Sequence, residues 1–184
     1  MIIRSLWNLY LGGLEKHPIK TKMATGMVIT SAGDLIAQKL VEGNDDVDFK
    51  RLLNMAIYGC VVAGGVGHYW YKGLDAAFGS KMNLRSTLKK MSVDLLLFAP
   101  PETAFFMAWA HLGSDQKEPV MEKLKKDYKN VLIADYLLWV PTQFINFCIV
   151  PERHRVLFQS VIMVFWSTFI SFASHNSLDN LNFL

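Results

Sequence analysis

The feature that most constrains this chain is a run of 20 residues, 52–71, that contains no Asp, Glu, Lys or Arg. A helix needs about 20 apolar residues to cross the hydrocarbon core of a bilayer, which is roughly 30 Å thick. Comparable apolar stretches follow, and a chain of 184 residues has no interior that could shield several such helices from water. The sequence therefore predicts an all-α integral membrane protein: a compact bundle of four to five transmembrane helices in a single multi-pass domain, 1–184.

The apolar stretches predict where the chain crosses the membrane. We expect spans at about 23–41, 52–71, 91–112, 131–150 and 156–174, of which the last is just long enough to cross. Before them, Ile3, Trp7, Tyr10 and Leu14 recur at helical spacing, so residues 2–16 are expected to form an amphipathic helix lying at the membrane surface. Lys and Arg are more numerous at the N-terminus and in the loops after the second and fourth spans, which favours a cytoplasm-like, inner location for those segments.

Composition narrows the classes of partner. Hydrophobic residues make up 52% of the chain and charged residues 19%, as expected for apolar spans joined by charged loops. The net charge of +3 is too small to indicate direct nucleic-acid binding, so the lipid bilayer is the expected partner. Cys60 and Cys148 both lie in apolar stretches. They are interpreted as buried small hydrophobes, with a redox pair as the alternative.

Ionisable residues at membrane depth are the candidate functional groups. A charge at the centre of a span costs about 2.5–3.5 kcal/mol on insertion scales, so such residues face a bundle interior or a water path. The candidates are Asp34, Asp94, Glu102 and Asp135. Helical spacing joins them to polar stripes, Thr30, Asp34 and Gln38 on the first span and Asp135, Trp139, Thr142, Gln143 and Asn146 on the fourth. Two interpretations are open: the stripes line or gate a solute pore, or they hydrogen-bond helices together.

Small residues and prolines add expectations about packing. Gly59, Ala63 and Gly67 recur every four residues, a pattern that favours close helix approach, either within the chain or in a homo-oligomer. Pro100 and Pro101 are adjacent inside the third span and are expected to break or kink it. Neighbouring helices or water must then satisfy the freed carbonyl groups.

Enzyme and metal-site motifs are not found in the sequence. The five histidines are scattered outside any H-E-x-x-H pattern, and there is no G-x-S-x-G elbow. An intramembrane aspartyl protease needs two carboxyl groups that share a proton. However, Ala32-Gly33-Asp34 lacks the G-x-G-D pattern, and Asp135-Tyr136 reverses the usual order. We therefore expect no enzyme, no cofactor and no metal site, and keep an intramembrane hydrolase as the weakest alternative.

One string near the C-terminus is specific enough to indicate a family. It reads W-V-P-T-Q-F-I-N-F from Trp139 to Phe147, followed by Val150-Pro151 and Arg155. This string resembles the signature of the peroxisomal membrane protein 22 kDa family, whose matching positions here are Trp139, Pro141, Gln143, Asn146, Phe147, Pro151, Arg155 and Trp166. Supporting landmarks are His17-Pro18, Gly33-Asp34 with Gln38, His68-Tyr69-Trp70-Tyr71 and Leu88-Lys89-Lys90-Met91. The resemblance covers about residues 7–170.

The resemblance carries expectations about function. Trp70-Tyr71-Lys72 and Lys126-Asp127-Tyr128 look most like the mitochondrial inner-membrane branch, which is linked to mitochondrial DNA maintenance and reactive-oxygen metabolism. The resemblance implies a weakly selective channel for small solutes. The basic loops of this chain add the expectation that anionic metabolites are drawn to its mouth. The expected location is the mitochondrial inner membrane, with the peroxisomal membrane as the alternative. A non-conducting structural or regulatory component is the alternative function.

The chain also departs from the family pattern. The Gly-Pro usual in the second span is replaced around Gly64-Gly65, which predicts a more flexible helix. The Asp-Gln that opens the third span is Asp94-Leu95 here. The family is usually described with four spans, so the fifth apolar stretch has no counterpart in that description.

Overall fold

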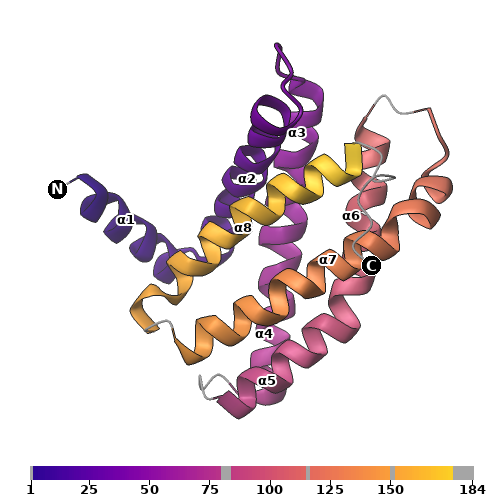
Figure 1. Ribbon diagram of the computed structural model, residues 1–184. Coiled ribbons are helices and arrows are strands. Elements are labelled where there is room, and N and C mark those ends of the chain that lie inside the picture. Colours follow the sequence, from indigo (N-terminus) through magenta and orange to yellow (C-terminus); the bar gives the residue numbers. More distant parts are fainter. Residues whose placement is uncertain (1, 80–83, 115–116, 150–151, 176–184) are drawn as a thin grey trace.

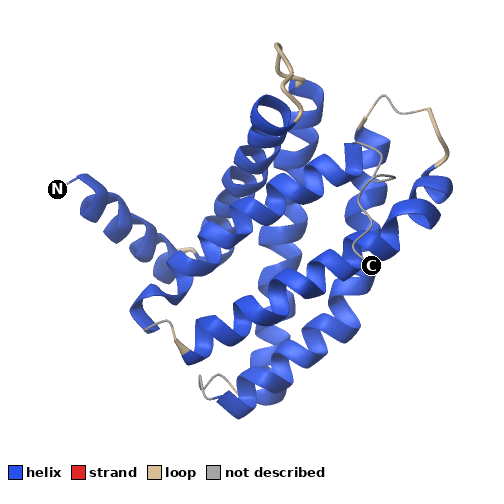
Figure 2. Cartoon of the chain, viewed as in Figure 1, coloured by secondary structure: helices blue, strands red, loops and turns tan. Residues whose placement is uncertain are grey.

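The computed structural model describes residues 2–79, 84–114, 117–149 and 152–175, and the side chains of 2–6, 146–148, 152–157 and 160 lie outside this description. Every regular element in the described part is a helix (Figures 1 and 2). The elements, with π-helical segments labelled η, are α1 (Ile2–Lys16), α2 (Pro18–Ile36), η1 (Ala37–Val41), α3 (Phe49–Tyr58), η2 (Gly59–Val66), α4 (Gly67–Phe78), α5 (Leu84–Val93), η3 (Asp94–Phe98), α6 (Ala99–Gly113), α7 (Val120–Cys148) and α8 (Glu152–His175).

These elements join into five long rods and one projecting helix. α2 continues into η1, and α3–η2–α4 and α5–η3–α6 are each continuous; α7 and α8 are the other two rods. α2 packs against η2, α3 and α8, while α6 packs against α7, and α7 against α8. α1 coincides with the range expected for the N-terminal helix and points away from the bundle (Figure 1). The all-helical fold is thus confirmed for the described residues.

One rod meets the length and composition of a membrane span by itself. The helix Phe49–Phe78 has 30 residues and contains a sufficiently long apolar window, and Val161–His175 is a shorter apolar helix. Among the described helices, the others do not pass this test. Charged residues inside the other rods, such as Lys123 and Asp127 on α7, lower the apolarity of a helix even where their side chains are buried.

The adjacent prolines of the third rod are accommodated without a break. Pro100 and Pro101 occupy the first turn of α6, directly after the π-helical segment η3. A π-helix bonds each N–H to the carbonyl five residues earlier, and proline has no N–H, so Pro100 leaves the Leu95 carbonyl without its partner. The Tyr136 hydroxyl on α7 donates to that carbonyl at 2.8 Å. The expectation that a neighbouring helix satisfies freed carbonyl groups is confirmed here.

Glycines set the closest helix contacts, but with a different spacing from the one expected. A Cβ at Gly59 would lie 2.1 Å from Thr30 Oγ1, and one at Gly64 would lie 2.5 Å from the Met23 Cα. Both glycines therefore let the second rod touch α2 within the same chain. At Gly67 a Cβ would meet only the Val62 carbonyl, at 3.8 Å. Because η2 is π-helical, residues five apart share its face, so the close contact runs through 59 and 64 rather than 59, 63 and 67.

The hydrophobic core lies toward one end of the bundle. Its buried members include Met55 and Tyr58 on the second rod, Phe106 and Met107 on α6, and Ile170 on α8. The end of η1, the start of α3, the end of α6, the start of α7 and the end of α8 meet at this end (Figure 1). The opposite end contains the end of α4, the start of α5, the end of α7 and the start of α8.

Candidate functional site

A cavity of about 520 Å³ is lined by residues of all five rods, with Thr30 as the contribution of α2. Its polar and charged lining consists of Thr30, Tyr58, Tyr71, Thr87, Lys90, Asp94, Glu102, Asp135, Gln143, Gln159 and Ser167. Its apolar and aromatic lining includes Leu74, Phe98, Phe106, Trp139, Met163, Trp166 and Ile170. Volumes of this size accommodate small organic molecules. We call this space the acid cavity, because three of its described lining residues are acids.

The three carboxyl groups come from three different elements. Asp94 opens η3, Glu102 lies in the first turn of α6, and Asp135 lies near the middle of α7. The Trp70 indole N–H donates to Asp94 Oδ1 at 2.6 Å, and the Tyr58 hydroxyl donates to Glu102 Oε1. Asp135 is 6% exposed, and its Oδ2 has no hydrogen-bond partner among the described residues. Two acids are thus held by neutral donors, and the third has an unused oxygen.

Positive charge is scarce in the acid cavity. Lys90 is its described cationic lining residue, and its Nζ already pairs with Asp75 Oδ1 at 2.5 Å. In the described part of the chain, none of the three cavity carboxyl groups takes part in a salt bridge. The cavity therefore presents an excess of acidic groups to whatever occupies it.

Aromatic and amide side chains form the wall next to Asp135. The rings of Trp139 on α7 and Trp166 on α8 meet edge to face, with centroids 6.4 Å apart. Beside them, the Gln159 side-chain amide donates to Gln143 Oε1 at 3.1 Å. Trp139, Gln143 and Trp166 all belong to the sequence signature, so that signature contributes directly to the cavity wall.

The structure places two members of the polar stripe of the first span, Asp34 and Gln38, outside the acid cavity. Both side chains are fully buried. Arg51 Nε donates to Asp34 Oδ1 at 2.7 Å, and the Gln38 amide donates to Asp34 Oδ2 at 2.8 Å. The Ser171 hydroxyl on α8 also donates to Asp34 Oδ1, at 2.5 Å. These side chains connect α2, α3 and α8, which is the hydrogen-bonding role foreseen as the alternative to a pore.

Arg51 is the residue at the centre of this arrangement. Its two terminal nitrogens donate to Glu42 Oε1 and Oε2, both at 2.9 Å, a bidentate geometry that favours Arg over Lys. It is only 6% exposed. The second span was expected to begin at residue 52, so the sequence analysis left Arg51 in the preceding loop and missed this role. Two cations, Lys50 and Arg51, stand in the first turn of a helix that is then uncharged to residue 71, in a chain with an intramembrane Asp; this is the signal that could have pointed to it. We call Asp34, Gln38, Glu42, Arg51 and Ser171 the ion-pair cluster.

The remaining predicted positions divide into three groups. Thr30 lines the acid cavity and also donates to the Met55 carbonyl at 2.9 Å. Thr142 is buried but lies outside the cavity lining, and Pro141 is accommodated inside the continuous helix α7. The side chains of Asn146, Phe147, Cys148 and Arg155, and the whole of Pro151, lie outside the described residues. Cys60 is a half-buried free thiol.

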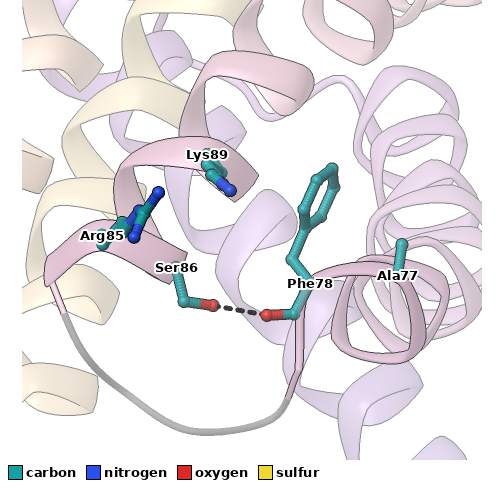
Figure 3. A pocket seen from close by; sticks show the side chains of 5 residues that line it. All are labelled: Ala77, Phe78, Arg85, Ser86 and Lys89. Atoms are coloured by element: carbon teal, nitrogen blue, oxygen red, sulfur yellow. Dashed lines mark hydrogen bonds between the residues drawn. The ribbon is translucent and has the colours of Figure 1, made fainter.

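A second, more open pocket of about 440 Å³ lies between the end of α4 and the start of α5. It is lined by Ala77, Phe78, Arg85, Ser86 and Lys89 (Figure 3). The Ser86 hydroxyl donates to the Phe78 carbonyl at 2.9 Å and ties the two helices together. The cations Arg85 and Lys89 place positive charge at the end of the bundle nearest the acid cavity.

Within the described residues, no group of three His, Cys, Asp or Glu side chains could hold a metal ion.

Comparison with known proteins identifies the relatives of this chain. Residues 113–171 match the Mpv17 / PMP22 family. "PXMP2/4 family protein 2" of Dictyostelium discoideum is 36% identical over 94% of this chain and 92% of its own length. "Mitochondrial inner membrane protein Mpv17" of Danio rerio is 33% identical over 92% of this chain and 97% of its own length. The human protein of the same name is 33% identical over 93% of this chain and 98% of its own length. No solved structure matches.

These relatives confirm the family resemblance and the predicted membranes. The names Mpv17 and PXMP2/4 correspond to the mitochondrial inner membrane and to the peroxisomal alternative, respectively. The matched segment 113–171 contains Asp135, Trp139, Gln143 and Trp166, so it includes one wall of the acid cavity.

Proposed function

The chain belongs to the Mpv17 / PMP22 family of membrane proteins, and from this premise we propose that it is a multi-pass helical protein of the mitochondrial inner membrane that passes small solutes. The observation that carries the proposal is the acid cavity, a space of about 520 Å³ with carboxyl groups set in aromatic walls. By family resemblance, this passage contributes to mitochondrial homeostasis, including mitochondrial DNA maintenance and reactive-oxygen metabolism.

The apolar surface of the bundle supports four to five membrane spans. Soluble monomers rarely expose large contiguous apolar patches. Here each rod exposes large apolar side chains: Val28 and Leu35 on α2, Leu53, Ile57 and Val61 on α3–η2, Leu96, Leu97 and Phe105 on η3–α6, Leu137, Val140 and Phe144 on α7, and Val161 and Phe165 on α8. Lipid is the environment in which the exposure of these apolar side chains costs the least free energy. Five charged residues within the described parts of the rods are buried among the helices, as membrane burial requires: Asp34, Arg51, Lys123, Asp127 and Asp135.

The cavity has one accessible side and one closed side. Its lining reaches Thr87 near the start of α5 and Gln159 near the start of α8, so it approaches the turns at that end. At its deep end it stops at the core, where the Tyr58 ring meets the Phe106 ring edge to face at 4.7 Å. Passage therefore requires this floor to move, and the hydrogen bond between Tyr58 and Glu102 is the contact that must open.

We further propose that no catalytic step is involved. The three cavity acids supply hydrogen-bond acceptors and charge along a path, and Asp34 is engaged by Arg51 rather than set opposite a second catalytic acid. An intramembrane hydrolase would instead require hydrolysis of an added substrate that depends on two of these acids.

The test is single-channel recording of the purified protein in planar bilayers, comparing the natural chain with Asp135→Asn. Glu122→Gln is the matched control, because Glu122 is exposed, lies on the same helix and is outside the cavity. The proposal expects discrete currents whose conductance or ion selectivity changes with Asp135→Asn and not with Glu122→Gln. Equal currents in all three proteins, with insertion verified by protease protection, would count against a path through the acid cavity.

A non-conducting structural component is the second candidate. The observation that favours it is the closed half of the bundle, where the core packs α3, α6, α7 and α8 together and the ion-pair cluster connects α2, α3 and α8. This candidate expects silent bilayers for every variant. It also expects the protein to be recovered in a complex of defined size, either a homo-oligomer or an assembly with other membrane proteins.

A further inference from the structure

The acid cavity contains a carboxyl group that the fold itself leaves incomplete. Asp135 is 94% buried, since its exposed fraction is 6%, and its Oδ2 has no described hydrogen-bond partner. Buried polar atoms are almost always paired, because leaving one unpaired costs about 1–3 kcal/mol. An orphan carboxyl oxygen beside a cavity of about 520 Å³ is therefore a position that a bound molecule can complete.

The surroundings of Asp135 select the charge of that molecule. Asp94 and Glu102 line the same cavity and interact electrostatically with Asp135. Each of these two accepts a hydrogen bond from a neutral donor, Trp70 or Tyr58, so neither brings a compensating positive charge. Lys90 is held by Asp75. The local field is negative, and it favours a cation over an anion.

The aromatic wall selects the kind of cation. Trp139 and Trp166 are in edge-to-face contact, with ring centroids 6.4 Å apart, next to Gln143 and Gln159. Indole faces attract organic cations and offer apolar area to a carbon skeleton. Small inorganic cations would need several more oxygen ligands than this wall supplies.

We propose that the acid cavity is a binding site for a small organic ammonium ion, with Asp135 as its counter-ion and Trp139 and Trp166 as its aromatic wall. The ammonium group donates hydrogen bonds to the Asp135 carboxylate, and the carbon skeleton lies against the indoles. This inference concerns the same cavity as the proposed function and names its class of solute. It revises the expectation of anionic metabolites, which rested on the basic loops outside the cavity.

The experiment is binding to the full chain in lipid nanodiscs, measured by isothermal titration calorimetry. The probes are benzylammonium, benzyl alcohol and benzoate, which share one skeleton and carry positive, zero and negative charge at pH 7. Empty nanodiscs measure the partition of each probe into lipid. We expect saturable binding of benzylammonium alone, at least about tenfold weaker in Asp135→Asn and unchanged in Glu122→Gln.

Each outcome decides the inference. Benzoate or benzyl alcohol binding as tightly as benzylammonium would overturn it, as would equal benzylammonium affinity in the natural chain and in Asp135→Asn. Trp139→Leu provides an independent test. We expect its affinity for benzylammonium to be several-fold weaker, and the change in tryptophan fluorescence that accompanies binding to be lost. Thermal unfolding of each variant verifies that it is folded. Because binding in nanodiscs needs no conduction, silent bilayers together with selective binding would refute the channel and leave the ammonium site standing.

Discussion

Two groups of buried acids in this bundle show opposite solutions to the same problem. In the ion-pair cluster, Asp34 receives donors from Arg51, Gln38 and Ser171, and Arg51 also binds Glu42 through two nitrogens. In the acid cavity, the described carboxyl groups have neutral donors or, at Asp135 Oδ2, none. The first arrangement completes its own hydrogen bonds and holds helices together. The second leaves capacity for a ligand, so the two groups should respond differently to substitution.

The largest expected effect is at the centre of the ion-pair cluster. Arg51→Met removes the positive charge from two buried carboxylates and should lower the free energy of unfolding by about 3–5 kcal/mol. The measurement is unfolding in mixed micelles as the fraction of sodium dodecyl sulfate is raised. Arg85→Met, an exposed Arg on α5, is the matched control and should change little. A loss below about 1 kcal/mol for Arg51→Met would remove the distinction between the two groups.

The next effect concerns the glycine contact that brings the closed half together. A Cβ at Gly59 would lie 2.1 Å from Thr30 Oγ1 and 2.4 Å from the Gly26 carbonyl, so Gly59→Ala should cost about 1–3 kcal/mol in the same assay. Gly67→Ala is the control, since its nearest neighbour would be 3.8 Å away. Equal losses at both positions would show that the π-helical register of η2 does not set the contact.

A smaller effect on the free energy of unfolding is expected at Tyr136, whose hydroxyl satisfies a carbonyl group beside the acid cavity. Tyr136→Phe leaves the Leu95 carbonyl without its donor and should cost about 1 kcal/mol. Tyr69→Phe, at an exposed tyrosine of α4, serves as the reference. If the two variants unfold alike, the proline-freed carbonyl must be satisfied in some other way.

The stability of the region around the ion-pair cluster should also depend on pH. Burial, followed by the positive charge of Arg51, lowers the pKa of the His175 imidazole at the end of α8, and its Nδ1–H donates to the Ser171 carbonyl at 2.8 Å. A lowered pKa means that the unfolded chain binds the proton more readily, so stability should fall modestly as pH drops below about 6.5. Thermal unfolding from pH 8 to pH 5 measures this slope. His175→Asn should flatten it, and an unchanged slope would assign the dependence to other groups.

The smallest expected effect is the most direct test of the comparison. Asp135→Asn removes the charge of a carboxyl group whose Oδ2 has no described hydrogen-bond partner, so it should cause no loss in the free energy of unfolding. Asp34→Asn, the same chemical change in the ion-pair cluster, weakens its interaction with Arg51 and should cost about 2 kcal/mol or more. Equal losses for the two variants would mean that Asp135 is as well satisfied as Asp34, which would weaken the case for a ligand there.

The sequence identified many residues of the candidate site, but it did not show which of them lie next to one another. Helical spacing identified Asp34 and Gln38 as one stripe and Asp135, Trp139 and Gln143 as another. It gave no means of telling that the first stripe meets an arginine and the second meets a cavity. The decisive contacts join residues far apart in sequence, as with Ser171 and Asp34, and they depend on which helices pack together.

The small-residue pattern illustrates a second limit. A four-residue repeat assumes α-helical geometry, and it grouped Gly59 with Ala63 and Gly67. The segment η2 is π-helical, so one extra residue enters the turn and the contact passes to Gly64. Flexibility was expected at Gly64-Gly65, but a change of helix type is a response to packing that periodicity does not reveal.

The sequence by itself determined the class of this protein, since long uncharged runs demand helices in lipid, and the signature from Trp139 to Arg155 indicates the family. Only the tertiary structure decided which buried acids are satisfied and which are not. The reason is physical: hydrophobicity and helical period depend on each segment alone, whereas the free energy of a buried carboxyl group depends on the atoms that other segments bring within hydrogen-bond distance. Arg51 reaches Asp34, and no described donor reaches Asp135 Oδ2.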